Sequence, residues 1–96
     1  MTEGAIEAVR RLIWDYRMTP EEFITLLDGE IKPGGFDRIW AMRRAAEGLN
    51  YYDLLEIVGL QRLARDWPIL KPTLRSQTRA KGIDYVLRKH HLSAPR

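Results

Sequence analysis

Apolar residues recur at steps of three and four along most of the chain, which is the spacing that places them on one face of a helix. In the first segment, residues 4–18, such a stripe is formed by Ile6, Val9, Leu12 (or Ile13) and Tyr16. Trp14 falls outside this stripe. It therefore needs a second contact, with another helix or with another chain.

The second segment carries the clearest helix boundaries in the chain. Thr19 is typical of an N-cap, Pro20 suits the first helical position, and Glu22 completes a capping box with Thr19. Gly29 can take the left-handed conformation that ends a helix. The residues expected to face inward between these limits are Phe23, Ile24, Leu26 and Leu27.

Three further helices are predicted in the middle of the chain. A loop at residues 32–35 (KPGG) precedes a helix over 36–48, and Asn50 caps a helix over 51–58 that is apolar nearly all round and so should be buried. The next helix carries an apolar stripe at Leu60, Leu63, Ala64 and Trp67. Pro68 is predicted to stop it and to leave residues 67–72 extended, because the residue before a proline disfavours helix.

The last part of the chain contains two candidate elements. One is a helix over residues 73–81, capped by Thr73 and ended by Gly82. The other covers residues 83–92 with Asp84 as its N-cap, and a short strand is the alternative there because of its β-branched and aromatic residues. We therefore predict an all-α fold, a compact bundle of about five or six short helices. It forms a single domain over residues 1–96, with a basic C-terminal part at 67–96.

Composition narrows the class of protein. The 96 residues are 45% hydrophobic, which is enough for one domain with its own core. The absence of cysteine excludes disulfides, thiolate catalysis and Cys-based zinc sites. No apolar run approaches the ~20 residues of a membrane span, and no signal peptide is visible, so we expect a cytoplasmic protein with no membrane association.

Charge is distributed unevenly along the chain. Residues 67–96 hold seven Lys or Arg against one Asp, whereas residues 1–66 hold nine against twelve acids. Such asymmetry points to an anionic partner, DNA or RNA, bound mainly through its phosphates. The expected contacts are Lys71, Arg75, Arg79, Lys81, Arg88 and Lys89. Arg75 and Arg79 are four residues apart and would share one face of the predicted helix at 73–81. A solvated basic surface without a partner explains the same residues equally well.

Large aromatic residues support a competing hypothesis, an adaptor or regulator that binds a protein partner or forms a homodimer. Trp, Tyr and Arg are favoured at the energetic centres of interfaces. Trp14 is the best candidate because it lies off its stripe, and the adjacent Tyr51 and Tyr52 cannot both face the core. Trp40 and Trp67 are better explained by core packing.

Catalytic and metal-binding chemistry finds little support in the sequence, so we expect a protein that is not an enzyme and needs no cofactor. His90 and His91 are the only histidines, and neighbouring side chains diverge too far to clamp one metal ion. Glu21 and Glu22 are explained by their place in the first turn of a helix. The loop at residues 32–35 lacks the spacing of a phosphate-binding loop.

Overall fold

The computed structural model describes residues 1–90 of the chain. These residues form six α-helices, namely α1 (Glu3–Leu12), α2 (Pro20–Leu27), α3 (Arg38–Gly48), α4 (Tyr51–Ile57), α5 (Leu60–Leu70) and α6 (Gln77–Lys89), and one short 3-10 helix, η1 (Lys71–Thr73). The prediction of an all-α bundle is confirmed. Within residues 1–90 the β-structure is limited to an isolated bridge between Lys32 and Phe36, which closes the KPGG turn.

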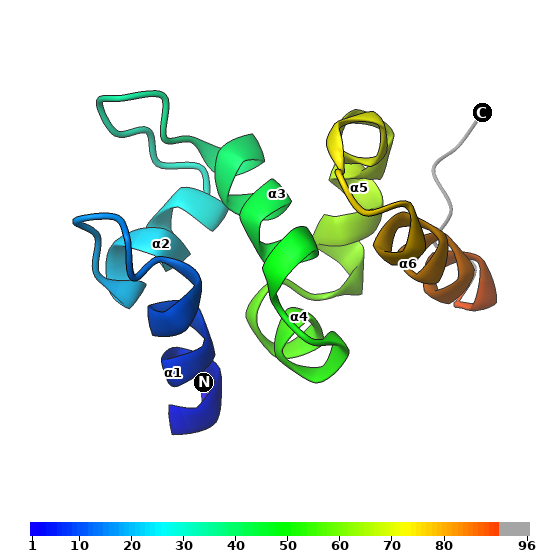
Figure 1. The fold of residues 1–96 in the computed structure, drawn as a ribbon, viewed down its shortest axis with the longest axis horizontal. Coiled ribbons are helices and arrows are strands. Elements are labelled where there is room, and N and C mark those ends of the chain that lie inside the picture. The colour runs from blue at the N-terminus through cyan, green and yellow to red at the C-terminus, as the bar shows by residue number, and fades with distance from the viewer. Residues whose placement is uncertain (91–96) are drawn as a thin grey trace.

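The helices pack around α3, which contacts α1, α2 and α5. In Figure 1, α3 crosses the middle of the molecule, with α1 and α2 on one side and α5 and α6 on the other. The radius of gyration is 12.9 Å. A compact domain of this length is expected to have a radius of about 13 Å, so the helices form one globule.

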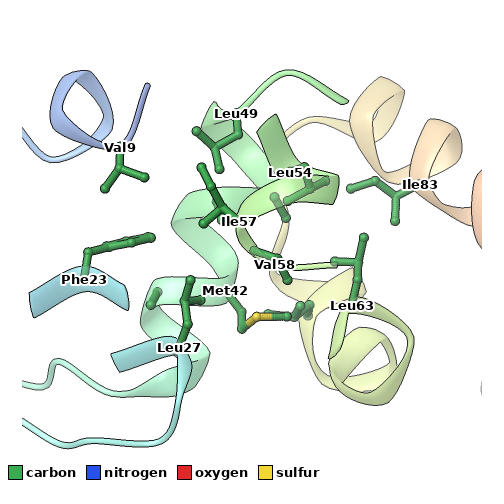
Figure 2. Packing of buried hydrophobic residues seen from close by; sticks show 14 of the residues in the cluster. Val9, Phe23, Leu27, Met42, Leu49, Leu54, Ile57, Val58, Leu63 and Ile83 are labelled. Atoms are coloured by element: carbon green, nitrogen blue, oxygen red, sulfur yellow. The ribbon is translucent and has the colours of Figure 1, made fainter. Parts of the chain in front are cut away.

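Every α-helix contributes to one hydrophobic cluster, as Figure 2 shows. Buried members from successive helices include Val9, Phe23, Met42, Ile57, Leu63 and Ile83. Beside this cluster, the partly buried Trp40 packs edge-on against Tyr16, Phe23 and Phe36. Trp67 is buried. The expectation that Trp40 and Trp67 serve the core is therefore confirmed.

Side-chain caps begin most of the helices. The Thr19 hydroxyl accepts from the Glu22 amide and the Glu22 carboxylate accepts from the Thr19 amide, so the predicted capping box is present. Asn50 caps α4 as predicted. Gly29 follows α2 with a φ of 109°, which is the left-handed conformation that glycine adopts readily. These interactions join residues close in sequence, which is why the sequence predicts them well.

The first helix is shorter than predicted. It ends at Leu12 rather than continuing to residue 18, and Ile13 is its C-cap. Trp14 therefore lies in the turn between α1 and α2 rather than on a helix. The turn directs Ile13 into the core and Trp14 into solvent.

The prediction that Pro68 stops the fifth helix is wrong, because α5 continues through Pro68 to Leu70. Proline has no N–H, so the helix loses one hydrogen bond, to the carbonyl of Ala64. The segment after Pro68 is not extended either, since η1 follows directly. Burial of Trp67 and Leu70 on the same side of α5 offsets the lost hydrogen bond.

The prediction of two separate elements after Thr73 is also wrong. A single helix, α6, begins after its N-cap Ser76 and runs through Gly82 to Lys89. Its buried residues Ala80, Ile83 and Leu87 form one continuous stripe, which holds the helix together across the glycine. Asp84 lies inside α6 and is not an N-cap, and Thr73 belongs to η1. The expected end of this element and His91 lie outside the described residues.

None of the helices within residues 1–90 has the length and apolar character that a membrane span requires.

Candidate polyanion-binding surface

The side of α6 that faces away from the core carries three exposed cationic side chains. The buried stripe of α6 fixes the rotation of the helix, so residues on its opposite side point to solvent. Four exposed residues on that side define what we call the outer face of α6: Lys81, Tyr85, Arg88 and Lys89. The first three are spaced four and three residues apart, and Lys89 follows Arg88 directly. Tyr85 is 60% exposed and lies between the cations. An aromatic ring is thus surrounded by positive charge on one helical face.

Within residues 1–90 the cations of the outer face, Lys81, Arg88 and Lys89, form no direct ion pair, although the charge of Arg88 helps to lower the pKa of Asp84. Their charges are therefore available to an external anion.

The single acid of α6 is occupied elsewhere. The Asp84 carboxylate accepts a hydrogen bond from the Trp67 indole N–H at 2.7 Å and pairs with the Lys71 ammonium at 2.5 Å. Burial raises the pKa of Asp84, but the hydrogen bonds from Lys71 and Trp67 outweigh it and lower the pKa below its usual value. Asp84 is therefore ionised at neutral pH, and its charge is compensated chiefly by Lys71 of η1.

Two of the six expected phosphate contacts have internal partners. Lys71 is paired with Asp84. The Arg79 guanidinium turns inward and donates to the carbonyl of Ala46 through Nε, at 2.9 Å, and to the carbonyl of Leu49 through Nη2. Because these carbonyls lie at the C-terminal end of α3, Arg79 satisfies acceptors that the helix itself leaves open.

The expectation that Arg75 and Arg79 share a helical face is wrong, since α6 begins only at Gln77. Arg75 lies in the segment before the helix, and its side chain is exposed. Its backbone N–H donates to the Glu47 carboxylate at 2.8 Å. Arg75 therefore stands at the edge of the basic region, next to an acid of α3.

The candidate protein-binding aromatics are exposed but do not form one cluster. Trp14 is 81% exposed and Tyr52 is 80% exposed, whereas Tyr51 is less so and packs edge-on against Tyr52 with ring centroids 5.7 Å apart. Trp14 lines a polar hollow of about 360 Å³ together with Arg11, Arg44 and Asp53. Neither tyrosine lines that hollow.

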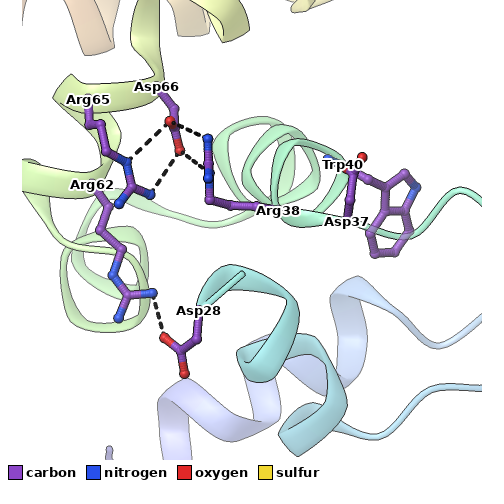
Figure 3. A network of polar contacts seen from close by, with 7 residues as sticks. All are labelled: Asp28, Asp37, Arg38, Trp40, Arg62, Arg65 and Asp66. Carbon is purple, nitrogen blue, oxygen red and sulfur yellow. Dashed lines mark hydrogen bonds and ion pairs between the residues drawn. The ribbon is translucent and has the colours of Figure 1, made fainter. Parts of the chain in front are cut away.

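Two groups escaped the sequence analysis. Tyr85 was not predicted to share a surface with Lys81, because the sequence suggested two separate elements where the structure has the single helix α6. Asp66 is 2% exposed, and its carboxylate accepts from Arg38 of α3 and from Arg65, each at 3.1 Å at the closest (Figure 3). Nearby, Arg62 pairs with Asp28 of α2. The Arg38–Asp66 and Arg62–Asp28 pairs join neighbouring helices, so we assign them a structural role rather than a catalytic one.

No group of three or more His, Cys, Asp or Glu residues within the described range is placed to hold a metal ion. His90 is exposed at the end of α6. Comparisons with protein-family models, with curated proteins and with solved structures found no match to this chain.

Proposed function

We propose that this protein binds a nucleic acid through the outer face of α6 and is not an enzyme. The observation that supports the proposal is the alignment of Lys81, Arg88 and Lys89 around the exposed ring of Tyr85, with no acid paired to them within residues 1–90. A cytoplasmic location is part of the same proposal.

The binding mechanism is charge neutralisation with release of counterions from the phosphate backbone. Arg75, at the start of the same segment, adds a further phosphate contact at the edge. Tyr85 offers a flat surface on which an unpaired base can stack, a contact worth about 1–3 kcal/mol that tolerates any base. We therefore expect single strands to bind more tightly than duplexes, without a preference for base sequence. Lys71 and Arg79 receive no role in binding, because both have internal partners.

The test is fluorescence anisotropy with labelled single-stranded DNA and RNA of mixed sequence. The triple variant Lys81→Glu/Arg88→Glu/Lys89→Glu reverses the outer face, and we expect it to bind at least tenfold more weakly than the wild type. A matched control reverses exposed arginines near α1, with the same change in net charge: Arg10→Glu/Arg11→Glu/Arg17→Glu. The control should bind within about threefold of the wild type at physiological salt, since screening limits long-range effects to roughly 8 Å. Equal affinity of the outer-face variant and the wild type would refute the proposal.

A second function is favoured by the exposure of Trp14, since a tryptophan that is 81% exposed is unusual in a protein that binds nothing. We propose as the alternative an interaction with a protein, including a second copy of the chain. Light scattering over a wide concentration range tests self-association. The homodimer would be supported if the mass of the wild type rises with concentration while the variant Trp14→Ala stays at the monomer mass. A constant monomer mass would exclude it.

A further inference from the structure

An apolar groove lies between α4, the start of α5 and α6. It encloses about 290 Å³, and its walls are formed by Tyr51, Leu54, Leu55, Leu60, Leu63, Thr78, Arg79, Gly82, Ile83 and Val86. Figure 2 shows Leu54, Leu63 and Ile83 from three of these helices converging at the edge of the core. Most of the lining is aliphatic, so the groove takes up apolar matter and holds ordered water poorly.

Gly82 lines the groove on the α6 side and contributes no side chain to it. A Cβ built on Gly82 would meet no atom within 4 Å, so the space beside this position is open. Glycine costs about 1 kcal/mol relative to alanine inside a helix. The glycine therefore leaves open space at the groove at a cost in helix stability.

On the α6 wall of the groove the polar side chains, Thr78 and Arg79, lie toward one end, and a further hydroxyl comes from Tyr51 of α4. Thr78 and Arg79 lie one helical turn before Gly82 and Ile83, and Val86 lies one turn after them. From Thr78 to Val86 the helix rises about 12 Å, at ~1.5 Å per residue. None of the lining residues is acidic. The α6 wall of the groove is therefore largely apolar, with a cation and a hydroxyl near one end.

Arg79 is held in place before any ligand arrives. Its Nε and Nη2 donate to the carbonyls of Ala46 and Leu49, which fixes the plane of the guanidinium. The remaining nitrogen, Nη1, has no hydrogen-bond partner in the described part of the chain. A fixed guanidinium with a spare donor can bind an anionic group without a further loss of side-chain freedom.

We propose that this groove binds a small, elongated apolar molecule with one anionic end, for which a medium-chain carboxylate is the simplest example. The chain lies along Leu54, Leu60 and Val86, and the carboxylate lies at Arg79 and Thr78. A volume of about 290 Å³ is at the lower limit of ligand pockets, ~300–1,000 Å³, so the ligand is small.

The experiment uses 1-anilinonaphthalene-8-sulfonate, a fluorescent apolar anion, and its displacement by decanoate. The variant Gly82→Leu fills the groove without meeting another atom at its Cβ, and it should raise helix propensity. The control Gln77→Leu adds the same side chain at an exposed position of α6 that does not line the groove. We expect saturable binding to the wild type and to the control, displacement by decanoate, and at least tenfold weaker binding to Gly82→Leu. Equal binding to all three proteins would overturn the proposal.

A second measurement needs no variant. In amide NMR spectra of the wild-type protein, decanoate should shift the signals of residues that line the groove, with Leu55, Gly82 and Val86 among the largest. Decanol, which lacks the charge, should produce the same pattern with at least threefold weaker affinity. Shifts centred on other parts of the molecule, or equal affinity for decanol and decanoate, would contradict the assignment.

This inference is independent of nucleic-acid binding. The triple variant of the outer face should retain decanoate binding, and Gly82→Leu should retain nucleic-acid binding. Loss of both activities in either variant would contradict the separation of the two sites.

Discussion

The structure predicts that Arg79 stabilises the fold, although the sequence suggests a surface cation. The variant Arg79→Met tests this prediction. Methionine keeps the unbranched apolar stem of arginine and removes only the guanidinium, so packing along the stem changes little. The carbonyls of Ala46 and Leu49 then lose their donor at the end of α3.

The expected size of the effect follows from these contacts. A hydrogen bond from a charged donor contributes about 1.5–3 kcal/mol net. Two carbonyls share the Arg79 guanidinium, but the residue is only half-buried and water can partly replace it. We therefore expect the free energy of unfolding to fall by about 2–3 kcal/mol. For a domain of this length such a loss lowers the melting temperature by roughly 10–20 °C.

Urea unfolding, followed by circular dichroism and by tryptophan fluorescence, measures the effect at pH 7. The control is Lys81→Met, which makes the same kind of change on the outer face of the same helix and should alter the free energy of unfolding by less than about 0.5 kcal/mol. If Arg79→Met is as stable as this control, the reasoning about Arg79 is wrong. Its guanidinium would then be free in solution, and it would return to the list of phosphate contacts.

Other predictions concern the acids. Asp84→Ala leaves the indole N–H of the buried Trp67 without an acceptor and should cost about 2 kcal/mol, whereas Asp84→Asn keeps an acceptor oxygen and should cost less than half of that in the same urea assay. Asp66→Asn should cost about 2–3 kcal/mol, because the carboxylate is buried against two guanidinium groups. Asp28→Asn breaks an exposed pair and should cost less than about 0.5 kcal/mol. Similar losses of stability in Asp66→Asn and Asp28→Asn would contradict this account. The Lys32 ammonium and the Thr19 amide lower the pKa of Glu22 from 4.5 to about 2. Since the folded pKa is the lower one, this stabilisation is present above pH 4.5 and is lost as the pH falls toward 2, so Glu22→Gln should lose less stability than the wild type in that range of an acid titration.

The sequence predicted those parts of the fold that short-range interactions determine. The capping box of Thr19 and Glu22 joins residues three apart, and the Asn50 cap is equally local. The helix boundaries at Pro68 and Gly82 were wrong because local preference was weighed without tertiary packing. Burial of Leu70 continues α5 beyond the proline, and the stripe of α6 continues across the glycine.

The candidate site was predicted only in outline, because partners distant in sequence decide which charges are free. Arg79 meets carbonyls 30 and 33 residues away, and Asp66 meets a guanidinium 28 residues away. Contacts between residues so far apart in the sequence cannot be inferred from the number of charges in a segment. The sequence did hold one indication of the burial of Asp66. In a helix that continues to Leu70, Asp66 lies beside the apolar stripe of Leu63 and Leu70 and is expected at the edge of that stripe.

The central claim is that the outer face of α6 binds nucleic acid through its phosphates. The most direct measurement is the affinity of the wild-type protein for a labelled single strand as a function of salt concentration. Four phosphate contacts, from Arg75, Lys81, Arg88 and Lys89, predict that log K falls against log salt with a slope of about −3, at ~0.7 per contact. Absence of binding at low salt, or binding that salt does not weaken, would contradict the claim and leave the exposed aromatic residues as the functional surface.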